Sequence, residues 1–87
     1  MQFENNTKEG VILLREESKE IGRLNYTLVH AEQKLIISYV LVHTEFKGTG
    51  MGKVLVEEAV RYAKQNQWSV EPHCSFARVI LQRMEKK

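Results

Sequence analysis

Residues 47–52, KGTGMG, join an apolar stretch to an amphipathic one, and this junction decides how the chain folds. Upstream, Leu35 to His43 is apolar on both of its alternating faces, which indicates a central strand covered on both sides. Downstream, apolar residues recur every three or four positions over residues 51–66, which predicts an amphipathic helix of about four turns. Trp68 to Pro72 is typical of a short strand. The order strand, helix, strand predicts a right-handed βαβ crossover whose two strands are parallel.

The first half of the chain has the period of strands. Gly10 to Arg15 is apolar enough for a short strand, and Ile21 to His30 alternates between two faces. Ala31 to Lys34 makes a tight connection to the strand at Leu35 to His43, and Gln2 to Asn5 could add a short edge strand. We therefore expect an antiparallel meander before the βαβ unit.

A second helix closes the chain, with Ser75 as its N-cap. Its apolar stripe, which we expect to pack in the core, consists of Phe76, Ala77, Ile80, Leu81 and Met84. The expected fold is thus α/β (α+β), with a mixed sheet, antiparallel first and parallel at its end, and two helices. At 87 residues the chain is too short for two independent cores, so we expect a single domain over residues 1–87.

Composition and charge exclude several classes of function. The formal net charge is only +2, and Lys and Arg are interleaved with Asp and Glu, which argues against a nucleic-acid binder. No apolar run approaches the roughly 20 residues that span a bilayer, and the polar N-terminus is unlike a signal peptide. The three histidines, His30, His43 and His73, show no metal-ligand spacing. The one cysteine, Cys74, allows no internal disulfide and fits a reducing compartment, so we expect a cytoplasmic protein without membrane or nucleic-acid partners.

The three glycines of the loop, at positions 48, 50 and 52, bring several backbone N–H groups and the positive end of a helix dipole around one point. Glycine lets a bulky anion approach the backbone closely, and Lys47 and Lys53 add positive charge. The alternative is a glycine-rich turn without a ligand. Two common phosphate motifs are excluded, because a P-loop needs a glycine at Lys47 and Ser or Thr at Val54, and the dinucleotide fingerprint needs a glycine at Lys53.

The loop resembles the pyrophosphate loop R/Q-x-x-G-x-G/A of the GNAT (GCN5-related) N-acetyltransferases. Lys47 stands where that motif has Arg or Gln, which keeps the charge but loses the planar fork of a guanidinium. The longer run HTEFKGTGMG at residues 43–52, followed by VEPHCSF at residues 70–76, is similar to a small single-domain GNAT-like subfamily. Its members carry a cysteine after the strand that follows the motif helix, here Cys74 in a P-x-C-x-F element.

The resemblance implies a binding site for acetyl-CoA or coenzyme A. In the family, the backbone of the strand before the loop holds the pantetheine arm and polarises the thioester carbonyl, and the matching residues here are Val42, His43 and Thr44. The pyrophosphate would lie against the loop and the first turn of the helix. The other implied coenzyme contacts are Lys47, Gly48, Thr49, Gly50, Met51, Gly52, Lys53 and Cys74.

Two residues are candidates for catalysis. Cys74, next to the start of the last helix, could be a nucleophile or a general acid, or it could be a small buried hydrophobic residue. His43 could be a base or merely a polar residue at a strand end. The resemblance implies an N-acetyltransferase that transfers the acetyl group of acetyl-CoA to an unidentified amine of a small molecule or protein. The alternative is a non-catalytic acyl-CoA-binding or interaction module, because the chain has no room for the helix pair and the last two strands of full-length GNAT enzymes.

Overall fold

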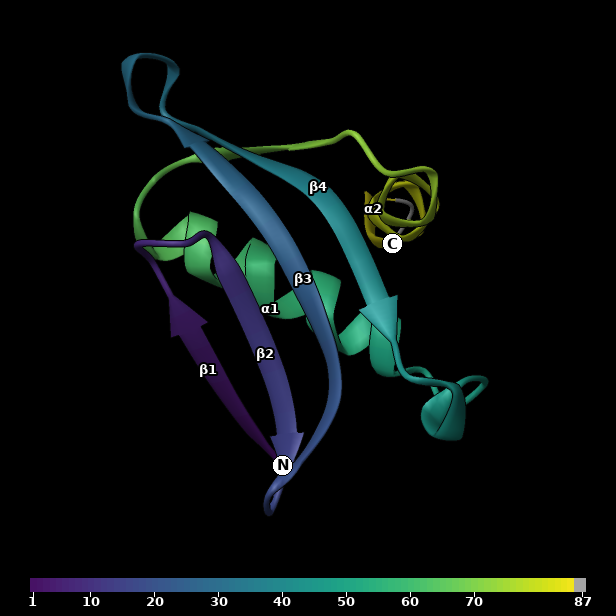
Figure 1. The fold of residues 1–87 in the computed structure, drawn as a ribbon. Coiled ribbons are helices and arrows are strands. Elements are labelled where there is room, and N and C mark those ends of the chain that lie inside the picture. The colour runs from purple at the N-terminus through teal and green to yellow at the C-terminus, as the bar shows by residue number, and fades with distance from the viewer. Residues whose placement is uncertain (86–87) are drawn as a thin grey trace.

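Within residues 1–85, which the computed structural model describes, a five-stranded sheet carries two helices (Figure 1). The strands, which lie across the sheet in chain order, are β1 (Gln2–Asn6), β2 (Val11–Glu16), β3 (Lys19–Val29), β4 (Lys34–Val42) and β5 (Ser69–Pro72). The helices are α1 (Met51–Gln65) and α2 (Ser75–Glu85), and the 3-10 turns η1 (His30–Glu32) and η2 (Thr44–Phe46) flank β4. Neither helix, as far as residue 85, is long and apolar enough to cross a membrane.

The strand pairing confirms the mixed sheet that the sequence predicts. β1, β2, β3 and β4 pair antiparallel in succession, and β4 and β5 are parallel. The expected edge strand near the N-terminus is β1, and the expected helix over residues 51–66 is α1, which ends at Gln65. The largest difference in the bounds is at β3, which begins at Lys19 and not at Ile21.

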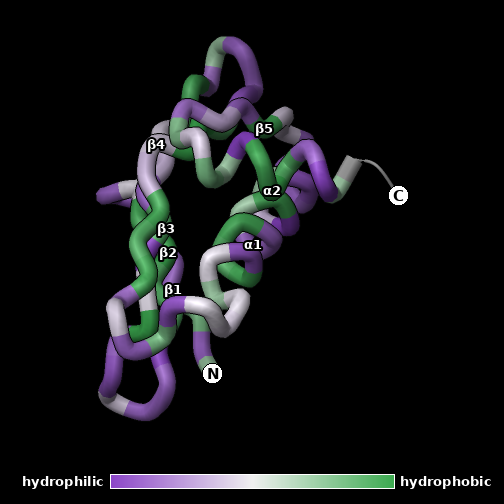
Figure 2. Tube along the Cα trace, turned by 90° about the vertical axis from the view of Figure 1, so that its right-hand side faces the viewer, coloured by the Kyte–Doolittle hydropathy of each residue, from purple (hydrophilic) through white to green (hydrophobic). Residues whose placement is uncertain are grey.

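The prediction that the strand over residues 35–43 is covered on both sides is wrong. Both helices lie on the same side of the sheet, and the other side has no second layer among the described residues (Figure 2). Leu35 and Ile37 point toward the helices and are fully buried, whereas the side chain of Tyr39 is 51% exposed. The apolar character of this strand therefore does not reflect burial on both faces.

A β-bulge in β4 also changes which of its side chains share a face. Tyr26 of β3 lies opposite Ile37, but its neighbour Asn25 lies opposite Tyr39, so Ser38 is the extra residue. Strict alternation would place Val40 on the face opposite to Ile37. The bulge instead puts Val40 across from the buried Leu24, on the helix-covered face.

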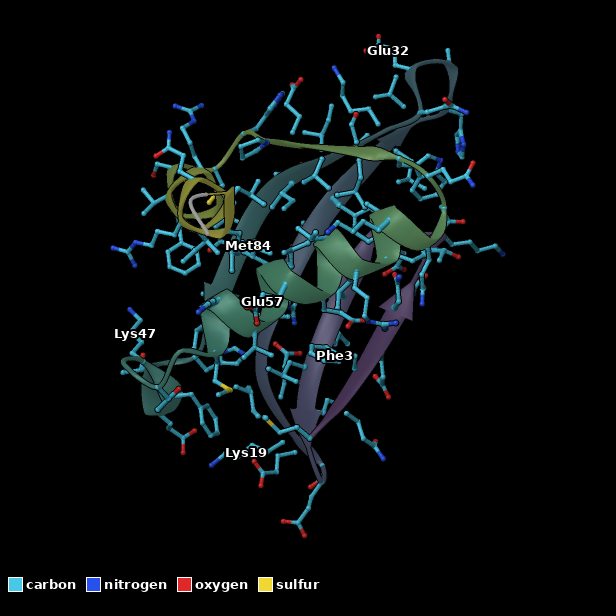
Figure 3. All side chains as sticks on the ribbon, turned by 180° about the vertical axis from the view of Figure 1, so that it is seen from behind. Phe3, Lys19, Glu32, Lys47, Glu57 and Met84 are labelled. Atoms are coloured by element: carbon cyan, nitrogen blue, oxygen red, sulfur yellow. The ribbon has the colours of Figure 1, made fainter. Side chains whose placement is uncertain are left out.

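The core lies between the sheet and the two helices, and Figure 3 shows it from the helix side. Its buried members are Ile12, Leu14, Ile21, Leu24, Tyr26, Leu35, Ile37, Leu55, Val56, Ala59, Ala63, Ala77 and Ile80. Helix α1 contributes one apolar stripe, as its periodicity predicts. Of the stripe predicted for α2, Ala77 and Ile80 are buried, but Phe76 is 43% exposed, so its assignment to the core is wrong.

Helix α2 begins directly after β5. The backbone N–H of Arg78 donates to the carbonyl oxygen of Cys74 over 3.0 Å, and the helix itself starts at Ser75. Cys74 therefore occupies the N-cap position, and the prediction of Ser75 as N-cap is wrong by one residue. The cysteine backbone thus marks the junction between the last strand and the last helix.

Candidate functional site

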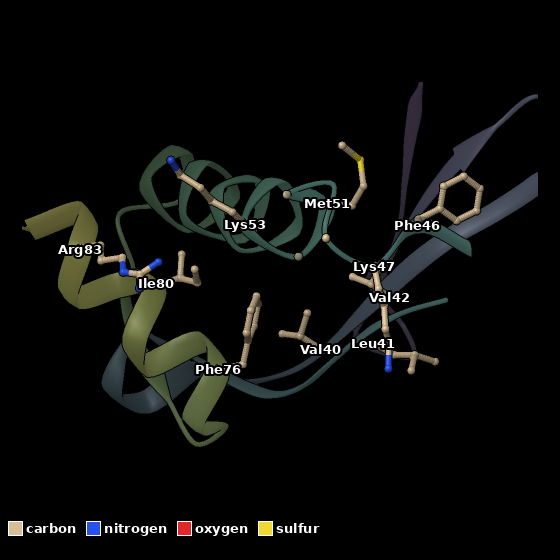
Figure 4. Close-up of a pocket in the computed structure, with 13 residues that line it drawn as sticks. Val40, Leu41, Val42, Phe46, Lys47, Met51, Lys53, Phe76, Ile80 and Arg83 are labelled. Carbon is tan, nitrogen blue, oxygen red and sulfur yellow. The ribbon is translucent and has the colours of Figure 1, made fainter. Parts of the chain in front are cut away.

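A cleft of about 560 Å³ opens between the end of β4, the loop before α1, and one face of α2 (Figure 4). Val40 and Val42 form its floor on the sheet side. Phe76 and Ile80 line it from α2, and the glycine loop lines it from the other side. The cleft therefore lies where the junction of β4 and α1 faces the last helix.

The glycine loop owes its shape to two left-handed backbone positions. Gly48 has φ +80° and Gly50 has φ +83°, a region that residues with a Cβ rarely adopt. A Cβ at either position would meet no atom within 4 Å, so both glycines border open space. The N–H and the hydroxyl of Thr49 both donate to the carbonyl oxygen of Phe46, which ties the loop back onto η2.

The start of α1 presents free hydrogen-bond donors. The first bond of the helix runs from the N–H of Val54 to the carbonyl oxygen of Gly50. The N–H groups of Met51, Gly52 and Lys53 therefore have no acceptor within the helix. Together with the positive end of the helix dipole, these three donors make an environment suited to an anion.

The two parallel strands separate partway along their length. β5 pairs with β4 only from Lys34 to Ile37, and the N–H of His73 makes the last contact, 2.9 Å from the carbonyl oxygen of Ile37. From residue 38 to residue 42, β4 has β3 on one side and, within the described part of the chain, no strand on the other. That unpaired edge leads directly to the cleft, because Val40, Leu41 and Val42 line it.

The ring of Phe76 stands in the cleft between α2 and β4, as Figure 4 shows. Its Cζ would lie 2.5 Å from a Cβ built on Gly52, so the ring packs directly against the backbone of the first turn of α1. Gly52 thus serves a different purpose from Gly48 and Gly50, because it allows two segments to approach closely.

Three cationic side chains line the cleft, and no Asp or Glu does so among the described residues. Lys47 comes from the loop, Lys53 from the first turn of α1 and Arg83 from the last turn of α2. Charge of one sign from three separate elements favours a ligand with negative charge, and the apolar walls favour a ligand that is partly apolar.

The sequence matches the family described as GCN5-related N-acetyl-transferase over residues 11–87. This match covers most of the chain and includes the loop, both helices and four of the five strands described above. The chain belongs to the GCN5-related N-acetyltransferase family. No curated protein matches this member of the family.

Solved structures of GNAT proteins share the fold of this GNAT chain. A GCN5-like protein from Staphylococcus aureus matches with a TM-score of 0.74 at 24% identity, over 97% of this chain and 80% of its own. The ribosomal-protein-S18-alanine N-acetyltransferase of Escherichia coli matches with a TM-score of 0.74 at 12% identity, over 92% of this chain and 54% of its own. The IAA acetyltransferase of Bacillus cereus matches with a TM-score of 0.70 at 22% identity, over 88% of this chain and 55% of its own. The GNAT chain described here thus spans about half the length of these two larger proteins.

Most of the coenzyme contacts expected for this GNAT chain lie together on the wall of the cleft. These are Val42, Lys47, Gly48, Gly50, Met51, Gly52 and Lys53. Thr44, Thr49, His43 and Cys74 do not line the cleft, although Thr49 shapes its loop. Sequence reasoning missed Arg83 and the exposure of Phe76. A spacing signal was present, because Phe76, Ile80 and Arg83 are four and then three residues apart and so share a helix face.

The side chain of His43 is engaged away from the cleft of this GNAT chain. Its Nε2 lies 2.6 Å from Oε2 of Glu20, and the guanidinium of Arg23 donates to the same carboxylate. The hydrogen bond to His43 is the main cause that lowers the pKa of Glu20, and Arg23 adds to it against the opposing effect of burial. This arrangement favours the interpretation of His43 as a polar residue that ties the end of β4 to β3.

Cys74 is partly buried and packs against the core at the point where β5 and β4 separate. Its neighbour His73 does not face it as a catalytic partner would, because Nε2 of His73 lies 2.6 Å from Oε2 of Glu71. Glu71 also accepts from Lys34 over 2.9 Å, and these two partners, Lys34 first, lower its pKa. The thiol is thus placed by the backbone junction and not by a side-chain network.

Proposed function

We propose that this chain binds acetyl-CoA in the cleft and transfers its acetyl group to an amine. One observation carries the proposal: the free N–H groups at the start of α1 and the unpaired edge of β4 open onto the same cleft. The first feature suits a phosphate and the second suits a chain of amides, and coenzyme A contains both.

The phosphate end of the coenzyme would lie against the loop. The N–H groups of residues 51–53 point out of the helix start, and the open space beside Gly48 and Gly50 leaves room for a pyrophosphate. Lys47 would add charge beside it. Lysine at position 47 supplies a point charge, so the backbone donors would fix the geometry.

The pantetheine arm would extend along the unpaired edge of β4. Its two amides can pair with the backbone of Ser38–Val42 as a neighbouring strand would, while Val40, Val42 and Phe76 contact its apolar groups. Of the residues that the resemblance implies, Val42, His43 and Thr44, this segment would include Val42, and the rest of it would lie upstream. The thiol end would then reach the point where the strands separate, near Ser38 and Cys74.

The transfer itself would need little beyond positioning. The amine nitrogen attacks the thioester carbonyl carbon, the carbon–sulfur bond breaks, and the sulfur takes up a proton as the amine loses one. A bulge leaves its extra residue outside the strand ladder, so the backbone N–H groups around Ser38 could stabilise the oxyanion. Cys74 follows His73, whose N–H makes the last contact between β5 and β4, whereas His43 is bound to Glu20, so Cys74 is the better catalytic candidate of the two.

Calorimetric titration of the whole chain with acetyl-CoA tests the binding step. We expect saturable binding, with backbone amide shifts concentrated at residues 38–53 and near Cys74 when the same titration is followed by NMR. Lys47→Ala should weaken the binding, and Lys64→Ala, on an exposed part of α1 away from the cleft, is its matched control. No saturable binding below millimolar concentration, or shifts scattered over the sheet, would overturn the proposal.

Intact-mass analysis after incubation with acetyl-CoA tests the role of Cys74. An adduct of one acetyl group that disappears in Cys74→Ala would mean that the thiol attacks the thioester and releases coenzyme A, before passing the acetyl group to the amine. If the parent chain transfers the acetyl group but shows no adduct, Cys74 would instead fit the role of a general acid. Full activity in Cys74→Ala would remove the residue from the mechanism.

The second candidate function is a non-catalytic acyl-CoA-binding or interaction module. It is favoured by one observation: the chain spans only 54% and 55% of the larger enzymes of the same fold, while the cleft proposed for the coenzyme is present. A panel of polyamines, amino acids and peptides, each incubated with the chain and acetyl-CoA, separates the two functions. Acetylation of any of them supports the enzyme, and tight binding without turnover supports the module.

A further inference from the structure

We propose that Arg83 and Lys53 together bind the ribose 3′-phosphate of coenzyme A and make the site selective for coenzyme A over its 3′-dephospho form. The inference rests on the proposed function and adds a second anion site to it. The two cations belong to different helices, since Lys53 lies in the first turn of α1 and Arg83 in the last turn of α2.

Lys53 and Arg83 lie apart from Lys47, the cation of the loop. Figure 4 shows Lys53 and Arg83 at the same end of the cleft, on facing helices, with Lys47 at the opposite end beside Val42. Met51, whose N–H is one of the free donors at the start of α1, lies between these two ends in Figure 4. A ligand with its pyrophosphate on those donors would thus have room for a further anionic group beside Arg83.

Neither cation is neutralised by the described part of the chain. Arg15, Arg23 and Arg61 each pair with a glutamate at 2.5–3.0 Å, but no such pair involves Lys53 or Arg83 among the described side chains. Glu57, one turn along α1 from Lys53, is exposed and does not line the cleft. Two like charges at the same end of the cleft, without a counterion among the described residues, favour an anion from outside.

The chemistry of the coenzyme supplies such an anion. Its 3′-phosphate is a monoester with a charge of about −1.5 to −2 at neutral pH, and it is attached to the adenosine end beyond the pyrophosphate. A guanidinium can hold two of its oxygens at once, and an ammonium adds a point charge. The pyrophosphate would occupy the free N–H groups at the start of α1. The side chains of Lys53 and Arg83 are then the donors that remain for the 3′-phosphate.

The test is a calorimetric comparison of coenzyme A with 3′-dephospho-coenzyme A on the full chain. The parent chain should bind coenzyme A about five- to twentyfold more tightly, which is the range between an exposed ion pair and a charge-assisted hydrogen bond. Arg83→Gln should lose most of that difference and leave the affinity for the dephospho form unchanged. Arg83→Lys should restore part of it, and Lys47→Ala should weaken both ligands by the same factor.

Arg78→Gln is the matched control, because Arg78 lies on the same helix but on a face outside the cleft, and it should leave both affinities unchanged. Far-ultraviolet circular dichroism of each variant shows whether it is folded. Equal affinity of the parent chain for both ligands would overturn this inference and leave the proposed function standing. The same would follow if Arg83→Gln weakened both ligands equally. Binding of neither ligand would overturn the proposed function and this inference together.

Discussion

The ring of Phe76 lies where a side chain on Gly52 would stand, with Cζ 2.5 Å from the position of a Cβ at residue 52. The first turns of α1 and α2 can approach this closely only because residue 52 carries no side chain. Gly52 is therefore a packing glycine, whereas Gly48 and Gly50 serve the left-handed backbone of the loop. The three glycines of one motif thus meet two different physical requirements.

Gly52→Ala should destabilise the chain by about 1–3 kcal/mol, the usual cost of forcing an extra methyl into a packed contact. In a Phe76→Ala background the same substitution should cost little or become neutral, because the obstructing ring is gone. Urea unfolding of the parent, both single variants and the double variant measures this coupling. An equal cost of Gly52→Ala with and without the ring would contradict the contact.

Gly50→Ala should be destabilising through the backbone alone, because a Cβ there would meet no atom within 4 Å. The left-handed conformation at φ +83° costs a residue with a Cβ about 1–2 kcal/mol. Gly50→Asn should cost clearly less, since Asn tolerates this region. Urea unfolding of both variants measures these two costs. An equal loss of stability in Gly50→Asn and Gly50→Ala would refute the prediction.

Tyr26→Phe should change the stability of the fold at alkaline pH. Burial, with a contribution from the neighbouring Tyr62, raises the pKa of Tyr26 from 10.0 to about 12. The folded state therefore holds the phenol proton more tightly, so its contribution is complete below pH 10 and is lost as the pH rises toward 12. Tyr26→Phe should flatten that alkaline loss, as measured by urea unfolding across this range. If the free energy of unfolding fell equally with rising pH in the parent and in Tyr26→Phe, the raised pKa of Tyr26 would be contradicted.

The same substitution should cost about 0.5–1.5 kcal/mol at neutral pH, because the hydroxyl of Tyr26 donates to Oδ1 of Asn5 over 2.6 Å. That hydrogen bond joins β3 to the edge strand β1, so the loss should be accompanied by faster amide exchange in β1. Unchanged exchange in β1 would mean that backbone pairing with β2 alone holds the edge.

Glu20→Gln should alter the acid side of the stability curve. The pKa of Glu20 is lowered from 4.5, first by its hydrogen bond with His43 and then by Arg23. Its contribution is therefore present above pH 4.5 and is lost as the pH falls through the lower, folded value. The variant should be less stable than the parent at neutral pH and should lose less on acidification. Glu57→Gln, which removes an exposed carboxylate, is the control, and identical acid curves for all three proteins would refute the role of Glu20.

Much of the fold could be predicted because its signals are local. The periodicity of α1 and the alternation of β3 each extend over enough residues to fix the type of element, and the glycines mark where the strand gives way to the helix. The two-sided covering predicted for β4 failed for a specific reason. An apolar pattern cannot reveal that Ser38 is bulged or that Tyr39 faces solvent, because both depend on pairing with β3.

The candidate site likewise has residues whose placement could be predicted from the sequence and residues whose placement could not. Lys47 to Lys53 are contiguous, so their placement on one wall follows from the local turn into the helix. The position of His43 could not be predicted, because its partner Glu20 is 23 residues away on another strand. The apolar stripe of α2 predicts packing against the core, and it does not indicate that Arg83 continues the face of Phe76 and Ile80 into the cleft.

The half-paired strand β4 has a further consequence for the chain in its ligand-free form. An unpaired edge such as Ser38–Val42 is a template onto which the strand of another molecule can add. If the coenzyme arm occupies that edge, it shields the edge from such contacts, so the liganded chain should resist aggregation on storage and heating better than the free chain. A coenzyme would then act on this small fold as a solubility factor as well as a reactant.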